Sequence, residues 1–363
     1  MTPSQVNIIF LGLGNVGQAL LRQILDTRDI VARRAGLRLV PVALADVSGL
    51  LFDPDGMTDE TLRAALTLQA KSTQDRKLLN ALPGIRPLSE VGDALRAGVI
   101  LVDLTASPKT EPTLRAALDS GCGLVLANKV PLAGAWDKAK SFFEHPRLHY
   151  EVTVGAGLPV IGTLQYLLDT GDQVTAIEGC LSGTLGYLCA ELERGVSYSA
   201  AVAQARSLGY TEPDPREDLG GRDVARKALI LARTSGWPLE LADLTIEPLY
   251  SESLAGVSVE EFMASASTLD EAYARRVQSA QAQGQVLRYV AHVTPSGGKV
   301  GLVAVPRDGP LGALHGPANY IAMHTSRYNQ VPLVVSGPGA GPEVTAAGVL
   351  GDIIHLAHQI KNL

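Results

Sequence analysis

A glycine-rich turn near the N-terminus constrains the fold more than any other feature of this chain. Gly12, Gly14 and Gly17 form the pattern G-x-G-x-x-G, after the apolar run 6–11 and before an amphipathic stretch from 18 to about 30. In such a strand–turn–helix unit the first glycine permits a tight turn. The second lets backbone N–H groups approach a pyrophosphate, and the third lets the helix pack on the sheet. The turn therefore predicts dinucleotide binding, because the helix N-terminus also attracts phosphate.

Apolar runs that alternate with helical patterns continue this domain. Further strand-like runs lie at 37–43, 99–104, 124–127 and 150–154, with a helical pattern at 111–118. Continuous apolar strands alternating with helices indicate a parallel sheet that is covered on both faces. We therefore expect an α/β fold with a Rossmann-type, doubly wound parallel sheet.

The pattern changes from about residue 161. Two long helical stretches, 183–194 and 218–234, are followed by strand-like runs at 285–293 and 300–306. A last glycine-rich turn then leads into a helix at about 343–359. This organisation predicts a second domain of α+β type.

Composition and charge exclude several classes of protein. Of 363 residues 46% are hydrophobic and 19% charged, a mixture that can bury a core and argues against disorder. The net charge of −6 argues against binding to nucleic acid or to anionic membrane surfaces. The first residues carry no basic signal region, and three cysteines are an odd number without metal-ligand spacing. We expect a cytoplasmic protein with no membrane or nucleic-acid partner.

Asp46 is the candidate residue for determining specificity between NAD and NADP. It follows the second predicted strand, where an acidic side chain binds the ribose 2′-hydroxyl of NAD. It lies 29 positions after Gly17, later than the roughly 20 typical of the motif, so the connecting helix must be long. No arginine or lysine adjoins it, and the sequence slightly favours NAD over NADP.

The segment 208–227 carries the densest group of charged residues. Glu212, Asp214, Glu217 and Asp218 follow one another in a loop that two prolines hold extended, and such a cluster suits a substrate ammonium group. After it, Asp223 and Lys227 are spaced i, i+4 on a predicted buried helix. Burial lowers the pKa of a lysine, which can then act as general acid and base. The competing interpretation is a surface loop followed by an ordinary salt-bridged helix.

Two further candidate site residues lie at the carboxyl ends of predicted strands. Lys129 stands at the carboxyl end of the run 124–127, the edge at which open α/β sheets bind ligands. Thr105 follows another strand and can meet a nicotinamide there. The alternatives are a strand-end surface lysine and a helix-capping threonine.

Taken together, these motifs resemble the homoserine dehydrogenase family over almost the whole chain. The matching segments are GLGNVG at 12–17, ANKVPLA at 127–133, EVTVGAGLPVI at 151–161, LSGTLGYL at 181–188, LGYTEPDPREDLGGRDVARK at 208–227 and GPGAGPEVTAAGVLGD at 337–352. The block at 208–227 is the most specific of them. The resemblance implies reversible, NAD(P)-dependent interconversion of L-homoserine and L-aspartate 4-semialdehyde, in the route to threonine, methionine and isoleucine.

The resemblance also implies a role for individual residues. Lys227, with Asp223 beside it, matches the lysine that exchanges a proton with the substrate hydroxyl, and Lys129 matches the lysine near the reacting carbon and the nicotinamide. Glu212, Asp218 and Gly209 match the substrate-binding wall. The positions that match cofactor contacts are Gly12, Gly14, Asn15, Val16, Gly17, Asp46, Thr105, Lys129 and Gly341. A monovalent cation, sodium or potassium, is implied at Glu151, Val154, Ala156 and Leu158.

The same resemblance implies how the chain is organised and assembled. We expect residues 1–150 with 338–363 to form the dinucleotide-binding domain, and 151–337 to form a catalytic and dimerisation domain of a homodimer. Only 12 residues follow Gly351, and no kinase segment precedes the glycine turn. We therefore expect a monofunctional enzyme without a regulatory domain and with weak or no inhibition by threonine.

Two other functions compete with this interpretation. One is a dehydrogenase that acts through a cysteine thioester, for which Cys122 is the candidate, although no histidine partner is evident. The other is a catalytically silent NAD-binding sensor, since a fold alone does not establish activity. Lys129, Asp223 and Lys227 argue against the sensor.

Overall fold

The computed structural model describes residues 2–68 and 79–361. It divides into two compact units, Met1–Gly157 with Gly341–Leu363, and Leu158–Ala340. The boundaries expected from the sequence lay at 150/151 and 337/338, a few residues away.

The first unit contains a six-stranded sheet in the order β3-β2-β1-β4-β5-β6. The strands are β1 Ser4–Leu11, β2 Leu37–Asp46, β3 Gly49–Phe52, β4 Ile100–Asp103, β5 Gly123–Leu126 and β6 Leu148–His149. Neighbours are parallel from β2 to β6, and the edge strand β3 runs antiparallel to β2. This order is that of a Rossmann fold, which confirms the predicted doubly wound sheet.

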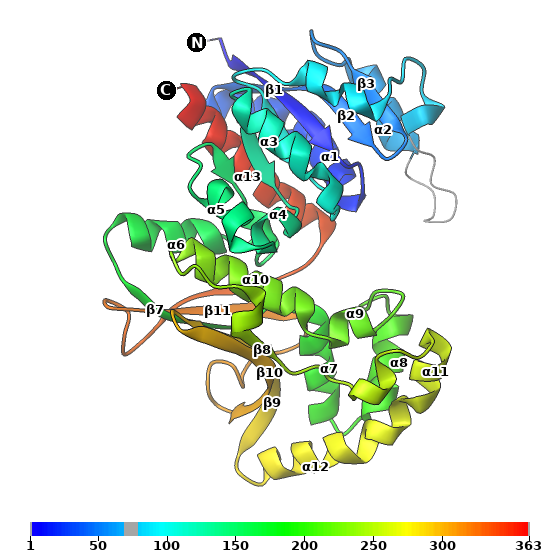
Figure 1. The fold of residues 1–363 in the computed structure, drawn as a ribbon, viewed down its shortest axis with the longest axis vertical. Coiled ribbons are helices and arrows are strands. Elements are labelled where there is room, and N and C mark those ends of the chain that lie inside the picture. The colour runs from blue at the N-terminus through cyan, green and yellow to red at the C-terminus, as the bar shows by residue number, and fades with distance from the viewer. Residues whose placement is uncertain (1, 69–78, 362–363) are drawn as a thin grey trace. The chain divides into compact units, whose positions relative to one another are not determined.

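Helices cover both faces of this sheet, with α1 and α13 behind it and α3 and α5 in front in the view of Figure 1. The helices are α1 Asn15–Ala35, α2 Asp59–Leu68, α3 Glu111–Asp119, α4 Val130–Ala133, α5 Trp136–Phe143 and α13 Pro342–Lys361. The 3₁₀ turns among the described residues of this unit are Leu79–Ala81, Leu88–Ala94, Pro108–Thr110 and Glu151–Thr153. The length of α1, 21 residues, explains the long interval between Gly17 and Asp46.

One predicted strand of this unit is wrong. The run 150–154 forms a 3₁₀ turn instead, and the sixth strand precedes it as β6. The carbonyl oxygen of Tyr150 accepts hydrogen bonds from the backbone N (3.1 Å) and the hydroxyl (2.7 Å) of Thr153. These local bonds turn the chain, whereas a strand would need partners on a neighbouring strand.

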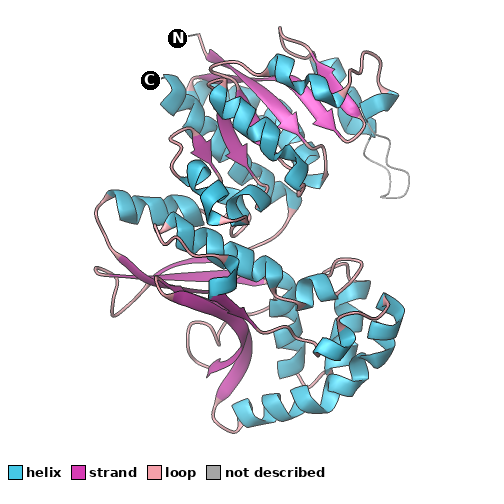
Figure 2. Cartoon of the chain, in the orientation of Figure 1, coloured by secondary structure: helices cyan, strands magenta, loops and turns pink. Residues whose placement is uncertain are grey.

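The second unit mixes helices and strands, as Figure 2 shows. Its sheet has six strands in the order β12-β11-β7-β9-β10-β8. The strands are β7 Val174–Cys180, β8 Leu244–Ile246, β9 Gln285–Thr294, β10 Gly297–Pro306, β11 Ala318–Thr325 and β12 Leu333–Pro338. The β7–β9, β7–β11, β9–β10 and β11–β12 pairs are antiparallel. The unit is therefore of α+β type, as predicted.

The helices of the second unit are α6 Val160–Asp169, α7 Gly183–Glu193, α8 Tyr198–Ser207, α9 Arg216–Leu219, α10 Arg222–Thr234, α11 Val259–Ser265 and α12 Asp270–Gln281. The 3₁₀ turns are Leu241–Asp243, Glu252–Leu254 and Ala266–Leu269.

The helix predicted over 218–234 is interrupted, so α9 and α10 are separate. Gly221 between them has φ +67°, and a Cβ there would lie 1.9 Å from the Tyr289 hydroxyl oxygen. Only glycine fits this position, and it lets α10 start in a new direction.

Candidate cofactor and substrate sites

The glycine turn of the first unit has the geometry that its spacing predicts. Gly12 has φ +97°, and its backbone N donates to the Ala45 carbonyl oxygen at 2.8 Å. A Cβ on Gly12 would come within 3.0 Å of Thr105, and one on Gly17 would come within 2.5 Å of the Gly12 carbonyl oxygen. Side chains are therefore excluded at both positions, which leaves the N-terminus of α1 open to a phosphate group.

A pocket of about 380 Å³ opens beside this turn, a volume in the range of small-molecule sites. Its lining unites four predicted residues, Gly12, Gly14, Asp46 and Thr105. Asn15, Val16 and Gly17 begin α1 instead, and neither Lys129 nor Gly341 is among the described residues of the lining. Sequence reasoning missed other residues of the lining, among them Leu88, Val91, Ser107, Lys109, Thr110 and Thr113. The glycines, the helix N-terminus and this pocket fit a dinucleotide.

Asp46 ends β2 with its carboxylate fixed by loop donors. One oxygen accepts from the backbone N (2.7 Å) and hydroxyl (2.6 Å) of Ser48, and the other accepts from the Leu79 backbone N at 3.0 Å. The carboxylate thus ties two loop segments together in addition to lining the pocket.

A buried carboxylate that sequence reasoning missed links the segments that follow β4 and β5 by hydrogen bonds. Asp103, fully buried at the end of β4, accepts from the Thr105 hydroxyl (2.7 Å) and the Thr110 hydroxyl (2.6 Å). It also accepts from the side-chain amide of Asn128 at 3.0 Å. The only signal in the sequence was an acidic residue closing an otherwise apolar strand.

Lys129 lies on a turn that the Asp103–Asn128 network holds in place. Gly341 lies at the start of the C-terminal helix. Asn128 accepts from the Val130 backbone N at 3.0 Å, which fixes the turn between β5 and α4 that carries Lys129. Gly341, with φ +125°, precedes α13, which packs against α1 and β5. The Glu343 carboxylate of α13 also contacts Arg22 of α1 at 3.0 Å.

The candidate cation ligands follow β6. Gly155 has φ +82° and Ala156 has φ +54°, so the backbone here turns through two successive left-handed residues. Val154 and Ala156 are buried, and such a turn can present carbonyl oxygens to a hard cation. Glu151 lies in the 3₁₀ turn just before, and the unit boundary separates Leu158 from the other three.

Lys227 of the second unit has a defined position in α10. Its Nζ lies 2.9 Å from a carboxylate oxygen of Asp223 and donates to the Leu181 carbonyl oxygen at 2.7 Å. The side chain is 13% exposed. The ammonium group is therefore oriented from two sides, and the side chain as a whole is not fully buried.

The acidic loop meets the same turn between β7 and α7. One oxygen of Asp218 accepts from the Thr184 hydroxyl at 3.3 Å, and the other accepts from the Glu212 backbone N at 2.8 Å. The turn from Leu181 to Thr184 thus joins the Lys227 pair to the acidic loop. Burial raises the pKa of Asp218, and the neighbouring carboxylates Glu212 and Asp223 raise it further.

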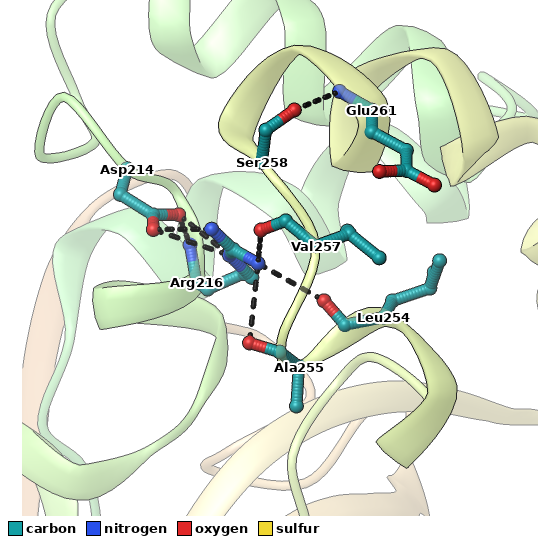
Figure 3. Close-up of polar contacts among 7 residues, drawn as sticks. All are labelled: Asp214, Arg216, Leu254, Ala255, Val257, Ser258 and Glu261. Atoms are coloured by element: carbon teal, nitrogen blue, oxygen red, sulfur yellow. Dashed lines mark hydrogen bonds and ion pairs between the residues drawn. The ribbon is translucent and has the colours of Figure 1, made fainter.

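The four loop acids lie in different environments. Arg216 forms a fork on Asp214, with Nε at 2.9 Å and Nη2 at 2.8 Å from its two oxygens, and this contact lowers the pKa of Asp214 (Figure 3). Glu217 is exposed. Glu212 is also exposed, and Asp218 is half-buried. Gly209 is exposed with φ +72°.

The thiols lack the environment of a nucleophile. Burial raises the pKa of Cys122, whose Sγ donates to the Arg96 carbonyl oxygen, and raises that of Cys180 to about 12 and of Cys189 to about 11. Within the described residues no group of acidic, histidine and cysteine side chains could hold a metal ion. None of the helices in the described ranges is both long and apolar enough to cross a bilayer.

Comparison with known proteins identifies the relatives of this chain. A family model described as homoserine dehydrogenase matches residues 159–354. The bifunctional aspartokinase/homoserine dehydrogenase 1 of Zea mays is 39% identical over 96% of this chain, which spans 38% of that protein. The homoserine dehydrogenase of Paracoccidioides brasiliensis is 39% identical over 72% of this chain and 75% of its own length. A hyperthermophilic archaeal homoserine dehydrogenase in complex with NADPH has a TM-score of 0.70 and 25% identity, with 98% of each chain covered.

Proposed function

The chain belongs to the homoserine dehydrogenase family, and from this premise we propose that it interconverts L-homoserine and L-aspartate 4-semialdehyde with NAD or NADP. It spans less than half the length of the bifunctional relatives that match it, so the proposal concerns the dehydrogenase reaction alone. Both substrates carry an ammonium group at one end and the reacting hydroxyl or aldehyde at the other. The second unit offers a matching pair of groups, acidic side chains and a lysine.

The position of Lys227 carries the proposal. Its Nζ is held by Asp223 at 2.9 Å and by the Leu181 carbonyl oxygen at 2.7 Å, and each of these acceptors engages one of the three N–H groups of the ammonium. We assign it the proton exchange: it accepts the hydroxyl proton of homoserine in oxidation and returns it to the aldehyde oxygen in reduction. Asp223 orients the lysine and stabilises its charged form.

The acidic loop would bind the other end of the substrate. The carboxylates of Glu212 and Asp218 would attract the ammonium group, and Gly209, where a Cβ would meet nothing within 4 Å, would belong to the same wall. Thr184 and the Glu212 backbone N already hold Asp218 in place, so less side-chain entropy is lost on binding.

The first unit would bind the cofactor. Bound NAD(P) supplies the hydride acceptor in oxidation and the hydride donor in reduction. Gly12, Gly14, Asn15, Val16 and Gly17 would receive the pyrophosphate at the start of α1. Thr105, Lys129 and Gly341 would hold the nicotinamide end, with Lys129 stabilising charge near the reacting carbon.

Three finer assignments belong to the same proposal. Asp46 favours NAD, because its carboxylate would accept from a ribose hydroxyl and repel a 2′-phosphate; the archaeal relative, by contrast, was solved with NADPH. Glu151, Val154, Ala156 and Leu158 would bind a structural monovalent cation. The protein would act as a homodimer through its second unit.

A direct assay tests the reaction. Purified protein is mixed with L-homoserine and either NAD or NADP, and reduced cofactor and semialdehyde are quantified. We expect both products in equal amounts, with a higher kcat/KM for NAD. Binding of the cofactor without any turnover would reject the dehydrogenase in favour of a silent sensor.

A further inference from the structure

Arg216 is the single basic residue in the acidic loop. Residues 208–221 contain four carboxylate side chains and this one arginine. Its side chain is only 12% exposed, although arginine usually keeps its guanidinium in water. A buried guanidinium needs a partner for each of its donor groups.

One edge of the guanidinium binds the loop itself. Nε lies 2.9 Å from one oxygen of Asp214, and Nη2 lies 2.8 Å from the other. The Arg216 backbone N also donates to Asp214 at 3.0 Å. This two-bond fork fixes direction as well as distance, which an ammonium group could not do.

The opposite edge binds a different segment of the chain. Nη1 donates to the carbonyl oxygens of Leu254 (3.1 Å), Ala255 (3.2 Å) and Val257 (2.6 Å), as Figure 3 shows. The guanidinium carbon also lies 5.4 Å from the centre of the Phe262 ring of α11. Arg216 therefore joins the acidic loop to the segment before α11.

We propose that Arg216 is a positioning residue for substrate binding. By fixing Asp214 between Glu212 and Asp218, it holds these two carboxylates in the arrangement that receives the substrate ammonium group. It also neutralises Asp214, so the loop does not open through repulsion among its acids. The inference deepens the proposed function and rests on it.

Kinetics of Arg216→Lys test this role, because lysine keeps the charge and loses the fork. A small misplacement of a positioned group costs up to about a hundredfold. We expect the KM for L-homoserine to rise about tenfold or more, with kcat at saturation and the Kd of NAD changed less than about twofold. Arg275→Lys is the matched control, since Arg275 is an exposed arginine paired with Glu271 on α12, and it should change none of these constants.

A second variant and a second readout cover the other outcomes. Asp214→Asn weakens the same fork from its other side, and it should also raise the KM for L-homoserine. This variant keeps the test available if Arg216→Lys does not fold. Hydrogen exchange of the backbone amides at 209–218, measured without substrate, should be faster in both variants than in Arg275→Lys. A lower melting temperature with unchanged KM and unchanged exchange would reduce Arg216 to a structural residue. Faster exchange in a protein that does not oxidise homoserine would reject the proposed function and retain the positioning of the loop.

Discussion

At the scale of single residues, Lys227 is the group whose loss should separate binding from chemistry. Lys227→Met removes the proton-exchanging amine and keeps the aliphatic chain. We expect kcat to fall by about 10²–10⁴-fold, the usual contribution of general acid–base catalysis, with the Kd of NAD unchanged. Lys140→Met is the control, because Lys140 forms a similar i, i+4 pair with Glu144 at the surface. A kcat within about threefold of the wild type would refute the role of Lys227.

Two carboxyl groups of the acidic loop should respond to pH with opposite signs. Burial raises the pKa of Asp218, so ionisation of this carboxyl group destabilises the folded protein. This destabilisation is absent below about pH 3.9, the pKa of an aspartate in the unfolded chain, and it grows as the pH rises through the higher native pKa. The pKa of Asp214 is lowered by Arg216, so its contribution is present above about 3.9 and is lost as the pH falls through the lower native value.

Unfolding free energies of Asp218→Asn and Asp214→Asn, measured from about pH 3 to pH 7, test this contrast. Relative to the wild type, Asp218→Asn should gain stability as the pH rises, and Asp214→Asn should lose it. Curves of the same sign would contradict the environments described for the two side chains.

Asp46 should govern cofactor preference. Asp46→Asn keeps an acceptor for the Ser48 backbone N and removes the negative charge that would face a 2′-phosphate. Like charges placed together cost up to several kcal/mol, so the ratio of kcat/KM for NADP over NAD should rise about tenfold or more. Asp55→Asn, at an exposed carboxylate of the same unit, should leave the ratio unchanged. An unchanged ratio in Asp46→Asn would mean that Asp46 serves only the loop segments it ties together.

At the scale of the element, the turn between β1 and α1 allows no side chain at its third glycine. A Cβ at Gly17 would lie 2.5 Å from the Gly12 carbonyl oxygen, a backbone atom that cannot move aside. Gly17→Ala should therefore weaken NAD binding about tenfold or more, as titration calorimetry would show. Gly351→Ala in α13, where a Cβ meets nothing within 4 Å, should instead stabilise the protein by about 0.5–1 kcal/mol. Equal affinities for NAD in the two variants would contradict the close packing of the turn.

The helices and strands also show which parts of the structure can be predicted from sequence patterns. The glycine turn, the parallel strands and α10 follow from local spacing, and all three were predicted. The 3₁₀ turn at Glu151–Thr153 was not, because its bonds to the Tyr150 carbonyl oxygen override an apolar, strand-like composition. The Asp103–Asn128 contact joins residues 25 positions apart, and no local pattern records such a pairing. Likewise, only the fold distinguishes Asp214, bound by Arg216, from Asp218.

At the scale of the whole molecule, the proposed reaction needs side chains from both units. The cofactor groups belong to the Rossmann unit, and Lys227 and the acidic loop belong to the second. The family model covers residues 159–354, which include Lys227 and the acidic loop, whereas the glycine turn lies outside the match. The proposed hydride transfer between L-homoserine and NAD(P) therefore depends on residues of both units.

The most direct test uses L-homoserine in which both hydrogens on the carbon that bears the hydroxyl group are replaced by deuterium. The protein is incubated with this substrate and NAD, and the reduced cofactor is analysed by mass spectrometry. We predict one deuterium in each reduced nicotinamide and one molecule of L-aspartate 4-semialdehyde for each cofactor reduced. Bound but unreduced cofactor, or reduced cofactor without deuterium, would contradict the account.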